Sequence, residues 1–126
     1  MLETRFNTKL LITAILFTAI VLILTHIPKE VMPSQLQENS PDKLYHVLAY
    51  GVITFLFLIS FRTSPTMLSA LLLFLAVSVI GAFDELTQPF VNRTASVTDL
   101  AANIVGILSA LLFFTLRKQW FLSPNP

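Results

Sequence analysis

The sequence predicts an all-α integral membrane protein, a bundle of four helices with both termini in the cytoplasm. Of its 126 residues, 55% are hydrophobic and only 12% are charged, whereas a soluble domain carries about 25% charged residues. A short chain also needs more polar surface for its volume than a long one. The composition therefore excludes a soluble globular domain. It also excludes a disordered chain, which combines low hydrophobicity with high charge.

Four apolar runs account for this composition. None contains Asp, Glu, Lys or Arg, and they cover residues 10–27, 44–61, 67–83 and 100–116. Each is near the lower length limit of a spanning helix and can be extended by its flanking residues. Backbone groups cannot stay unpaired in lipid, so each run should be helical, and none shows the alternation of a membrane β-strand. We expect one domain over residues 1–126, with helices at about 10–27, 44–61, 67–88 and 99–116.

The connections and helix starts carry ordinary breaker and capping residues. Residues 28–43 hold three prolines and should form an extended loop, while residues 62–66 should form a tight turn. Asp42 suits the N-cap or first turn of the second helix. Ser96 or Thr98 should cap the fourth helix. The first run resembles a signal peptide, but no A-x-A-like site follows, so we expect an uncleaved helix.

The distribution of charge predicts the orientation. One side would carry five basic residues, and the other would carry only Lys29, Lys43 and Arg93. Because basic residues are retained in the cytoplasm, the five-residue side should be cytoplasmic. Six of the seven acidic residues fall on the opposite side. The five basic residues are Arg5, Lys9, Arg62, Arg117 and Lys118.

Polar residues gather at three helix ends that share this outer side. In the second helix Asp42, His46 and Tyr50 recur every four residues and so line one face. The third helix ends and the fourth begins with further polar residues. Polar side chains near the bilayer are costly, so a shared functional site is the default hypothesis. The additional members are Asp84, Glu85, Gln88, Arg93, Asp99 and Asn103.

Each of these residues also has a structural interpretation. Asp42 and Asp99 could act only as helix caps, and Lys43 could extend into solvent. His46 could bond a carbonyl group, and Asn103 could join helices beside small residues. The remaining cases are Gln88 and Glu85 as interfacial residues, Arg93 as a neutralising partner for an acid, and His26 in a structural role at the membrane interface.

These residues resemble a motif of the VanZ-like family of small bacterial membrane proteins. The similarity covers about residues 40–110, and its most specific parts are the Arg93-to-Asp99 interval and the Asp-x-x-x-Asn-x-x-Gly run. Two positions depart from the family, because Asn92 and Ala110 stand where members often have Gly. The matching runs are Asp42-Lys43-x-x-His46-x-x-x-Tyr50, Asp84-Glu85-x-x-Gln88-x-Phe90, and Arg93 with Asp99, Asn103 and Gly106.

The resemblance implies a multi-pass protein of the bacterial plasma membrane that acts at the cell envelope. The family takes its name from a member that lowers susceptibility to the glycopeptide teicoplanin. The resemblance implies no mechanism, so whether the chain is an enzyme stays open.

The first hypothesis is a binding protein whose external polar site takes a glycopeptide, a lipid headgroup or a lipid-linked cell-wall precursor. Arg93 and the acidic residues would give specificity through charge-assisted bonds. Membrane lipids are expected neighbours, while a net charge of +1 gives no reason to expect nucleic acid. A third hypothesis, a transporter or assembly subunit, would require a homo-oligomer. The predicted binding residues are Lys43, Tyr50, Gln88, Arg93 and Asn103.

The second hypothesis is a metal-assisted membrane enzyme that modifies a lipid-linked substrate. His46 would be the general acid or base, oriented by Asp42. Asp84, Glu85 and Asp99 would hold a divalent cation. No HExxH, GxSxG or P-loop motif is present, and the absence of Cys excludes thiolate chemistry.

Overall fold

The protein is all-helical across the part of the chain that its computed structural model describes, residues 5–34 and 42–122, with side chains as far as Arg117. Four helices in these ranges are long and apolar enough to span a membrane, which confirms the predicted fold class. Two short 3₁₀ helices, η1 (Lys29–Val31) and η2 (Gln88–Val91), lie in the connections. The long helices are α1 (Thr8–Thr25), α3 (Asp42–Ser60), α4 (Met67–Thr87) and α5 (Val97–Leu122).

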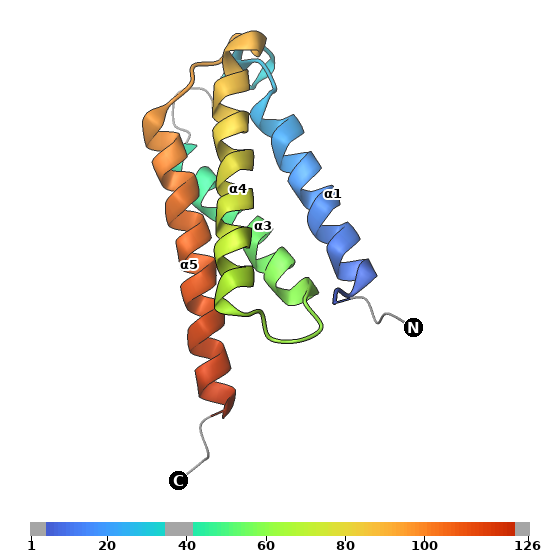
Figure 1. Cartoon of the computed structure of the whole chain (residues 1–126). Coiled ribbons are helices and arrows are strands. Elements are labelled where there is room, and N and C mark those ends of the chain that lie inside the picture. The colour runs from blue at the N-terminus through green and yellow to red at the C-terminus, as the bar shows by residue number, and fades with distance from the viewer. Residues whose placement is uncertain (1–4, 35–41, 123–126) are drawn as a thin grey trace.

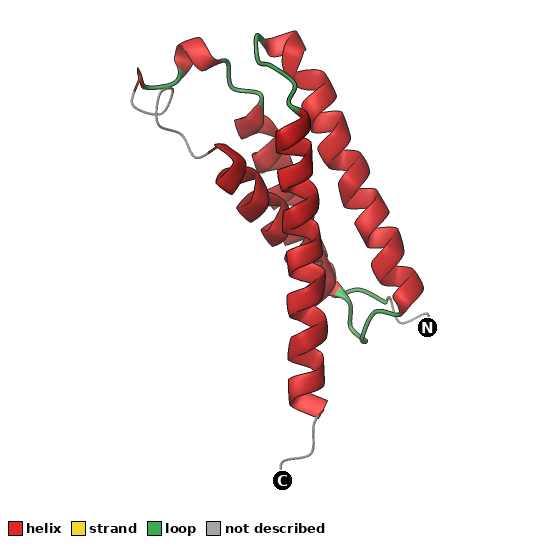
Figure 2. Cartoon of the chain, turned by 90° about the vertical axis from the view of Figure 1, so that its left-hand side faces the viewer, coloured by secondary structure: helices red, strands yellow, loops and turns green. Residues whose placement is uncertain are grey.

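Helix α3 is the centre of the bundle. It contacts α1, α4 and α5, and its contact with α5 is the most extensive between any two helices described. Both termini and the turn between α3 and α4 lie at one end of the bundle (Figures 1 and 2). The described residues that follow α1, the start of α3 and the connection from α4 to α5 lie at the other end, which we call the polar end. The alternating topology predicted from the four apolar runs is therefore confirmed.

The helix boundaries extend beyond the apolar runs where capping or charge permits. Asn7 caps α1, because its Oδ1 accepts hydrogen bonds from the backbone N–H groups of Lys9 (3.1 Å) and Leu10 (3.4 Å). The fourth long helix continues past the predicted end at residue 116 to Leu122.

The start of α5 follows the predicted capping pattern. Ser96 Oγ accepts a hydrogen bond from the backbone N–H of Asp99 at 3.3 Å, while Thr98 is already inside the helix. Asp99 lies in the first turn, as Asp42 does in α3. These caps place both acidic residues at the polar end, where they face the positive ends of the helix dipoles.

A short strap joins the residues before α1 to the end of α3. The Asn7 amide donates to the Ser60 carbonyl at 2.7 Å, and the Arg62 amide donates to the Arg5 carbonyl at 3.0 Å. The rings of Phe6 and Phe61 pack with centroids 4.7 Å apart. The strap fixes α1 against α3 at the end opposite the polar end.

Glycines allow α3 and α5 to cross closely. A Cβ atom at Gly106 would lie 2.3 Å from the Val47 carbonyl oxygen, a distance that no side chain tolerates. This close approach is the small-residue packing predicted for Gly106, and Ala110 on the same helix is also buried. Most large apolar side chains face outward, including Leu16, Leu48 and Phe113. An apolar exterior around a polar interior suits a bundle in lipid.

Candidate functional site

Six polar side chains from three long helices and the 3₁₀ helix η2 are buried together at the polar end, and we call them the polar cluster. Burying so many polar groups is costly unless they are mutually satisfied or bind something. Their convergence was predicted from the sequence, and the structure confirms it. The members are His46 of α3, Asp84 and Glu85 of α4, Gln88 of η2, and Asp99 and Asn103 of α5.

His46 is the centre of the polar cluster. Its imidazole is only 5% exposed, and its Nδ1 lies 2.8 Å from Asn103 Oδ1 and 3.7 Å from Glu85 Oε1. On the other side of the ring, Nε2 lies 3.9 Å from Asp99 Oδ2 and 4.0 Å from Asp42 Oδ1. One imidazole thus faces three carboxylates and one amide from three helices.

Asp84 is fully buried and holds α1 and α3 against α4. The Tyr50 hydroxyl donates to its Oδ2 at 3.0 Å. The Thr25 hydroxyl donates to its Oδ1 at 2.5 Å, and His26 Nδ1 lies 3.4 Å from the same oxygen. Both carboxylate oxygens are therefore engaged by protein groups.

Glu85 is engaged in the same way. Its Oε2 accepts a hydrogen bond from the Ser96 backbone amide at 3.1 Å, and its Oε1 accepts one from Gln88 Nε2 at 3.4 Å. These bonds join the end of α4 to the start of α5. Gln88 therefore has a structural partner rather than a free amide directed at a ligand.

Helix α1 contributes residues that the sequence analysis did not assign to the site. Thr25 contacts Asp84, and His26 Nε2 lies 2.8 Å from Thr87 Oγ1 at the end of α4. His26 was assigned only a structural role at the interface. The position of His26 at the outer end of an apolar run indicated that it lies near the predicted site. No pattern in the neighbouring residues indicated that its side chain faces the bundle.

The two basic residues of the predicted site lie at its edge. Lys43 is 65% exposed, and its Nζ is 3.9 Å from Asp99 Oδ1, so it lies at the rim of the polar cluster. Arg93 is half-buried and donates from Nη1 to the Ile27 carbonyl at 3.2 Å. Its buried Nε has no hydrogen-bond partner in the described part of the chain. The preceding residue, Asn92, has a left-handed backbone with φ of 58°.

A pocket of about 580 Å³ opens between α1 and α3 beside the polar cluster, and we call it the α1–α3 pocket. Apolar side chains of both helices form its walls, among them Phe17, Leu24 and Val52. Polar groups, including His46 and Arg93, line its other part. The pocket thus combines an apolar channel with a charged end.

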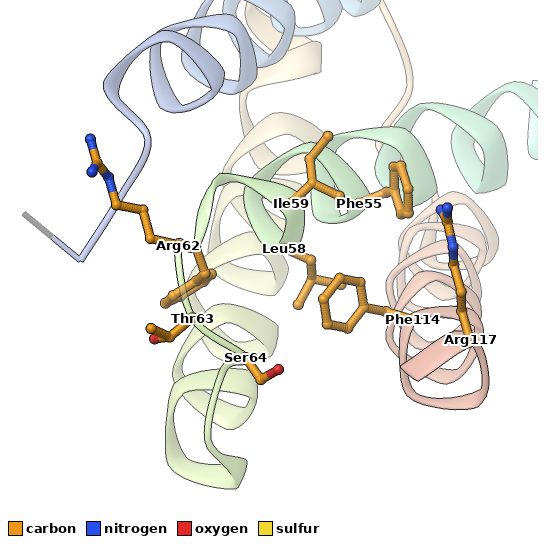
Figure 3. A pocket seen from close by; sticks show the side chains of 9 residues that line it. Phe55, Leu58, Ile59, Arg62, Thr63, Ser64, Phe114 and Arg117 are labelled. Atoms are coloured by element: carbon orange, nitrogen blue, oxygen red, sulfur yellow. The ribbon is translucent and has the colours of Figure 1, made fainter. Parts of the chain in front are cut away.

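A second pocket, of about 430 Å³, lies at the opposite end of the bundle (Figure 3). Side chains from the end of α3, the following turn and α5 surround it, including Leu58, Ser64 and Phe114. In Figure 3 the Arg62 guanidinium points away from Leu58 and Phe114, toward the segment before α1. This pocket contains none of the residues predicted to form the site.

The acidic residues and His46 could hold a metal ion. Two groups of ligand atoms lie close enough together, Asp42 with His46 and Asp99, and His46 with Asp84 and Glu85. No group described combines Asp84, Glu85 and Asp99, the set predicted from the sequence. That set therefore stays a prediction, and the two groups above are the combinations that the geometry provides.

Comparison with protein-family models, with curated proteins and with solved structures finds no match to this chain.

Proposed function

We propose that this chain is a VanZ-like protein of the bacterial plasma membrane that binds the anionic headgroup of a lipid-linked envelope molecule. Candidates of this class are a membrane lipid and a lipid-linked cell-wall precursor. The proposal is supported by the position of the motif residues, because His46, Asp99 and Asn103 lie together beside the α1–α3 pocket. The left-handed Asn92 also supports the family resemblance, since Gly adopts this conformation most readily.

The α1–α3 pocket is the observation that carries this proposal. Its apolar walls suit an isoprenoid or acyl chain, and its polar part offers the half-buried guanidinium of Arg93. Arg93 lines the pocket, and its guanidinium, whose buried Nε has no partner among the described residues, supplies a positive charge for a phosphate. Bonds between a guanidinium and a phosphate are among the strongest that proteins form.

A glycopeptide is a different class of ligand, and the pocket favours it less. Its apolar walls would go unused by a large water-soluble peptide, whereas they match the chain of a lipid. A protein that holds a lipid-linked precursor could still alter glycopeptide susceptibility by limiting access to that precursor.

Binding of farnesyl phosphate tests the proposal, with farnesol as the matched uncharged ligand. We expect the full chain in detergent to bind farnesyl phosphate at least tenfold more tightly than farnesol. Arg93→Gln should remove this preference, whereas Arg117→Gln, at the opposite end of the bundle, should keep it. Equal binding of the two ligands by the wild type would refute a phosphate-binding site, and tighter binding of teicoplanin than of either would favour the glycopeptide.

A metal-assisted enzyme is a second candidate, favoured by the position of His46 between Asp42 and Asp99. A buried imidazole beside carboxylates can transfer protons, and an adjacent cation would polarise a phosphate. Turnover of a lipid-linked precursor that is abolished by His46→Ala and by chelation would establish this activity. Binding of the precursor without turnover would support headgroup binding and would contradict catalysis.

A further inference from the structure

We infer that a single divalent transition-metal ion binds between Asp42, His46 Nε2 and Asp99, with Asn103 positioning the imidazole. The assignment differs from the predicted ligand set of Asp84, Glu85 and Asp99. It rests on the geometry of the polar cluster and does not depend on headgroup binding.

The environment of His46 leaves the required nitrogen available. Nδ1 lies 2.8 Å from Asn103 Oδ1, which only accepts hydrogen bonds, so Nδ1 carries the proton. The Glu85 carboxylate, 3.7 Å from Nδ1, favours the same tautomer. The lone pair of a neutral imidazole is then on Nε2. Such a bond from the second ring nitrogen is typical of histidines that bind metals.

The ligand atoms of Asp42, His46 and Asp99 lie within 4.8 Å of one another, and both separations from His46 Nε2 have the spacing that one ion requires. Two atoms each about 2.1 Å from an ion lie between about 3.0 and 4.2 Å apart for bond angles from 90° to 180°. Nε2 is 4.0 Å from Asp42 Oδ1 and 3.9 Å from Asp99 Oδ2, both within this interval. None of these separations is a hydrogen bond, so the three groups face a common point without satisfying one another.

Asp99 points to a ligand on independent grounds. Its side chain is only 8% exposed, and its buried Oδ1 accepts no hydrogen bond in the described part of the chain. The nearest cation, Lys43 Nζ, lies 3.9 Å away on a side chain that is 65% exposed. A buried carboxylate oxygen without a hydrogen bond is costly, and a cation bound by the same carboxylate would remove that cost.

The alternative group, His46 with Asp84 and Glu85, is already satisfied by the protein. Asp84 accepts bonds from Tyr50 and Thr25, and Glu85 accepts bonds from Ser96 and Gln88. An ion there would have to break these bonds and the bond of His46 Nδ1 to Asn103. The group with Asp42 and Asp99 requires no such loss.

The ligand set also indicates the class of metal. Two carboxylates balance the charge of one divalent ion, which makes a buried site neutral. An imidazole nitrogen with two oxygens suits Mn²⁺ or Zn²⁺ better than Ca²⁺ or Mg²⁺, which prefer oxygen ligands. Asp42 and His46 both line the α1–α3 pocket, so the ion would lie at its wall.

Mn²⁺ binding to the full chain in detergent tests this inference. We expect one bound Mn²⁺ that Zn²⁺ displaces, with ¹⁴N coupling to an imidazole in its pulsed paramagnetic resonance spectrum. Asp42→Asn should weaken binding at least tenfold. It should leave the fold intact because the Asp42 side chain is 43% exposed. Asp99→Asn should weaken binding similarly, while Asp84→Asn should retain the ion and its ¹⁴N coupling.

Several results would overturn the inferred metal site. No stoichiometric Mn²⁺ binding, or binding without ¹⁴N coupling, would exclude this site. Loss of the ion in Asp84→Asn but not in Asp42→Asn would transfer it to the other group. Farnesyl phosphate binding, measured on chelator-treated protein, separates failure of the metal site from failure of headgroup binding.

Discussion

His46 Nδ1 of α3 and Asn103 Oδ1 of α5 lie 2.8 Å apart inside the bundle, between the two helices that have the most extensive contact of any described pair. Asn103 Oδ1 accepts a hydrogen bond from His46 Nδ1–H and so turns Nε2 toward Asp42 and Asp99. One hydrogen bond between two helices therefore orients the only imidazole of the polar cluster.

This pair should be energetically coupled. A double-mutant cycle of His46→Ala and Asn103→Ala should give a coupling free energy of about 0.6 kcal/mol and at most about 1.7 kcal/mol, the average and maximum for hydrogen bonds between membrane helices. The measurement is the free energy of unfolding of the four proteins in bicelles. Additive effects of the two substitutions would show that the 2.8 Å contact contributes no specific stability.

Tyr50→Phe should destabilise the bundle, since it removes the hydroxyl that donates to Asp84 and leaves a buried carboxylate with one fewer bond. The expected loss in the free energy of unfolding is about 1–3 kcal/mol. Tyr45→Phe is the matched control on the same helix, because Tyr45 is exposed. Equal effects of the two substitutions would contradict the role assigned to the Tyr50 hydroxyl.

The crossing of α3 and α5 should tolerate a methyl group at one glycine and not at the other. A Cβ at Gly106 would meet the Val47 carbonyl oxygen at 2.3 Å, whereas one at Gly51 would meet the Gly106 carbonyl oxygen at an ordinary 3.4 Å. Gly106→Ala should therefore cost about 1–3 kcal/mol or more of unfolding free energy. Gly51→Ala should change it by less than about 0.5 kcal/mol. Similar losses of unfolding free energy in the two variants would mean that α3 and α5 cross at a greater distance than the structure shows.

The predicted orientation can be measured by labelling, since the chain contains no Cys. Thr94 lies at the polar end and Ser64 at the opposite end, and both are exposed. In intact cells an impermeant maleimide should label Thr94→Cys, and it should reach Ser64→Cys only after permeabilisation. The reverse pattern would place the polar end in the cytoplasm and remove its access to external ligands.

Local patterns were sufficient to predict the fold and part of the site. Charge-free runs predict spanning helices because few other structures satisfy the backbone in lipid. The four-residue spacing of His46 and Tyr50 predicts a shared face, and both side chains are buried there. Ser96 was recognisable as a cap because capping depends on neighbouring residues alone.

The rest of the site depends on contacts between distant segments. Thr25 reaches Asp84 across 59 positions of the chain, and no local pattern distinguishes it from the other threonines of α1. The ligand set inferred from the structure differs from the predicted set of Asp84, Glu85 and Asp99 for the same reason. Whether a carboxylate oxygen lacks a hydrogen bond, like Asp99 Oδ1, or already accepts one, like Asp84 Oδ2, is decided only when the helices pack.

The central claim is that the phosphate of a lipid-linked ligand binds beside Arg93 at the polar end. The location of a bound phosphate tests this claim most directly. The ³¹P resonance of bound farnesyl phosphate can be recorded with a nitroxide on Thr94→Cys, next to Arg93, or on Ser64→Cys at the opposite end. The account predicts strong paramagnetic broadening by the label at residue 94 and little by the label at residue 64. Broadening by the label at residue 64 alone would place the phosphate at the wrong end of the bundle and contradict the proposed site.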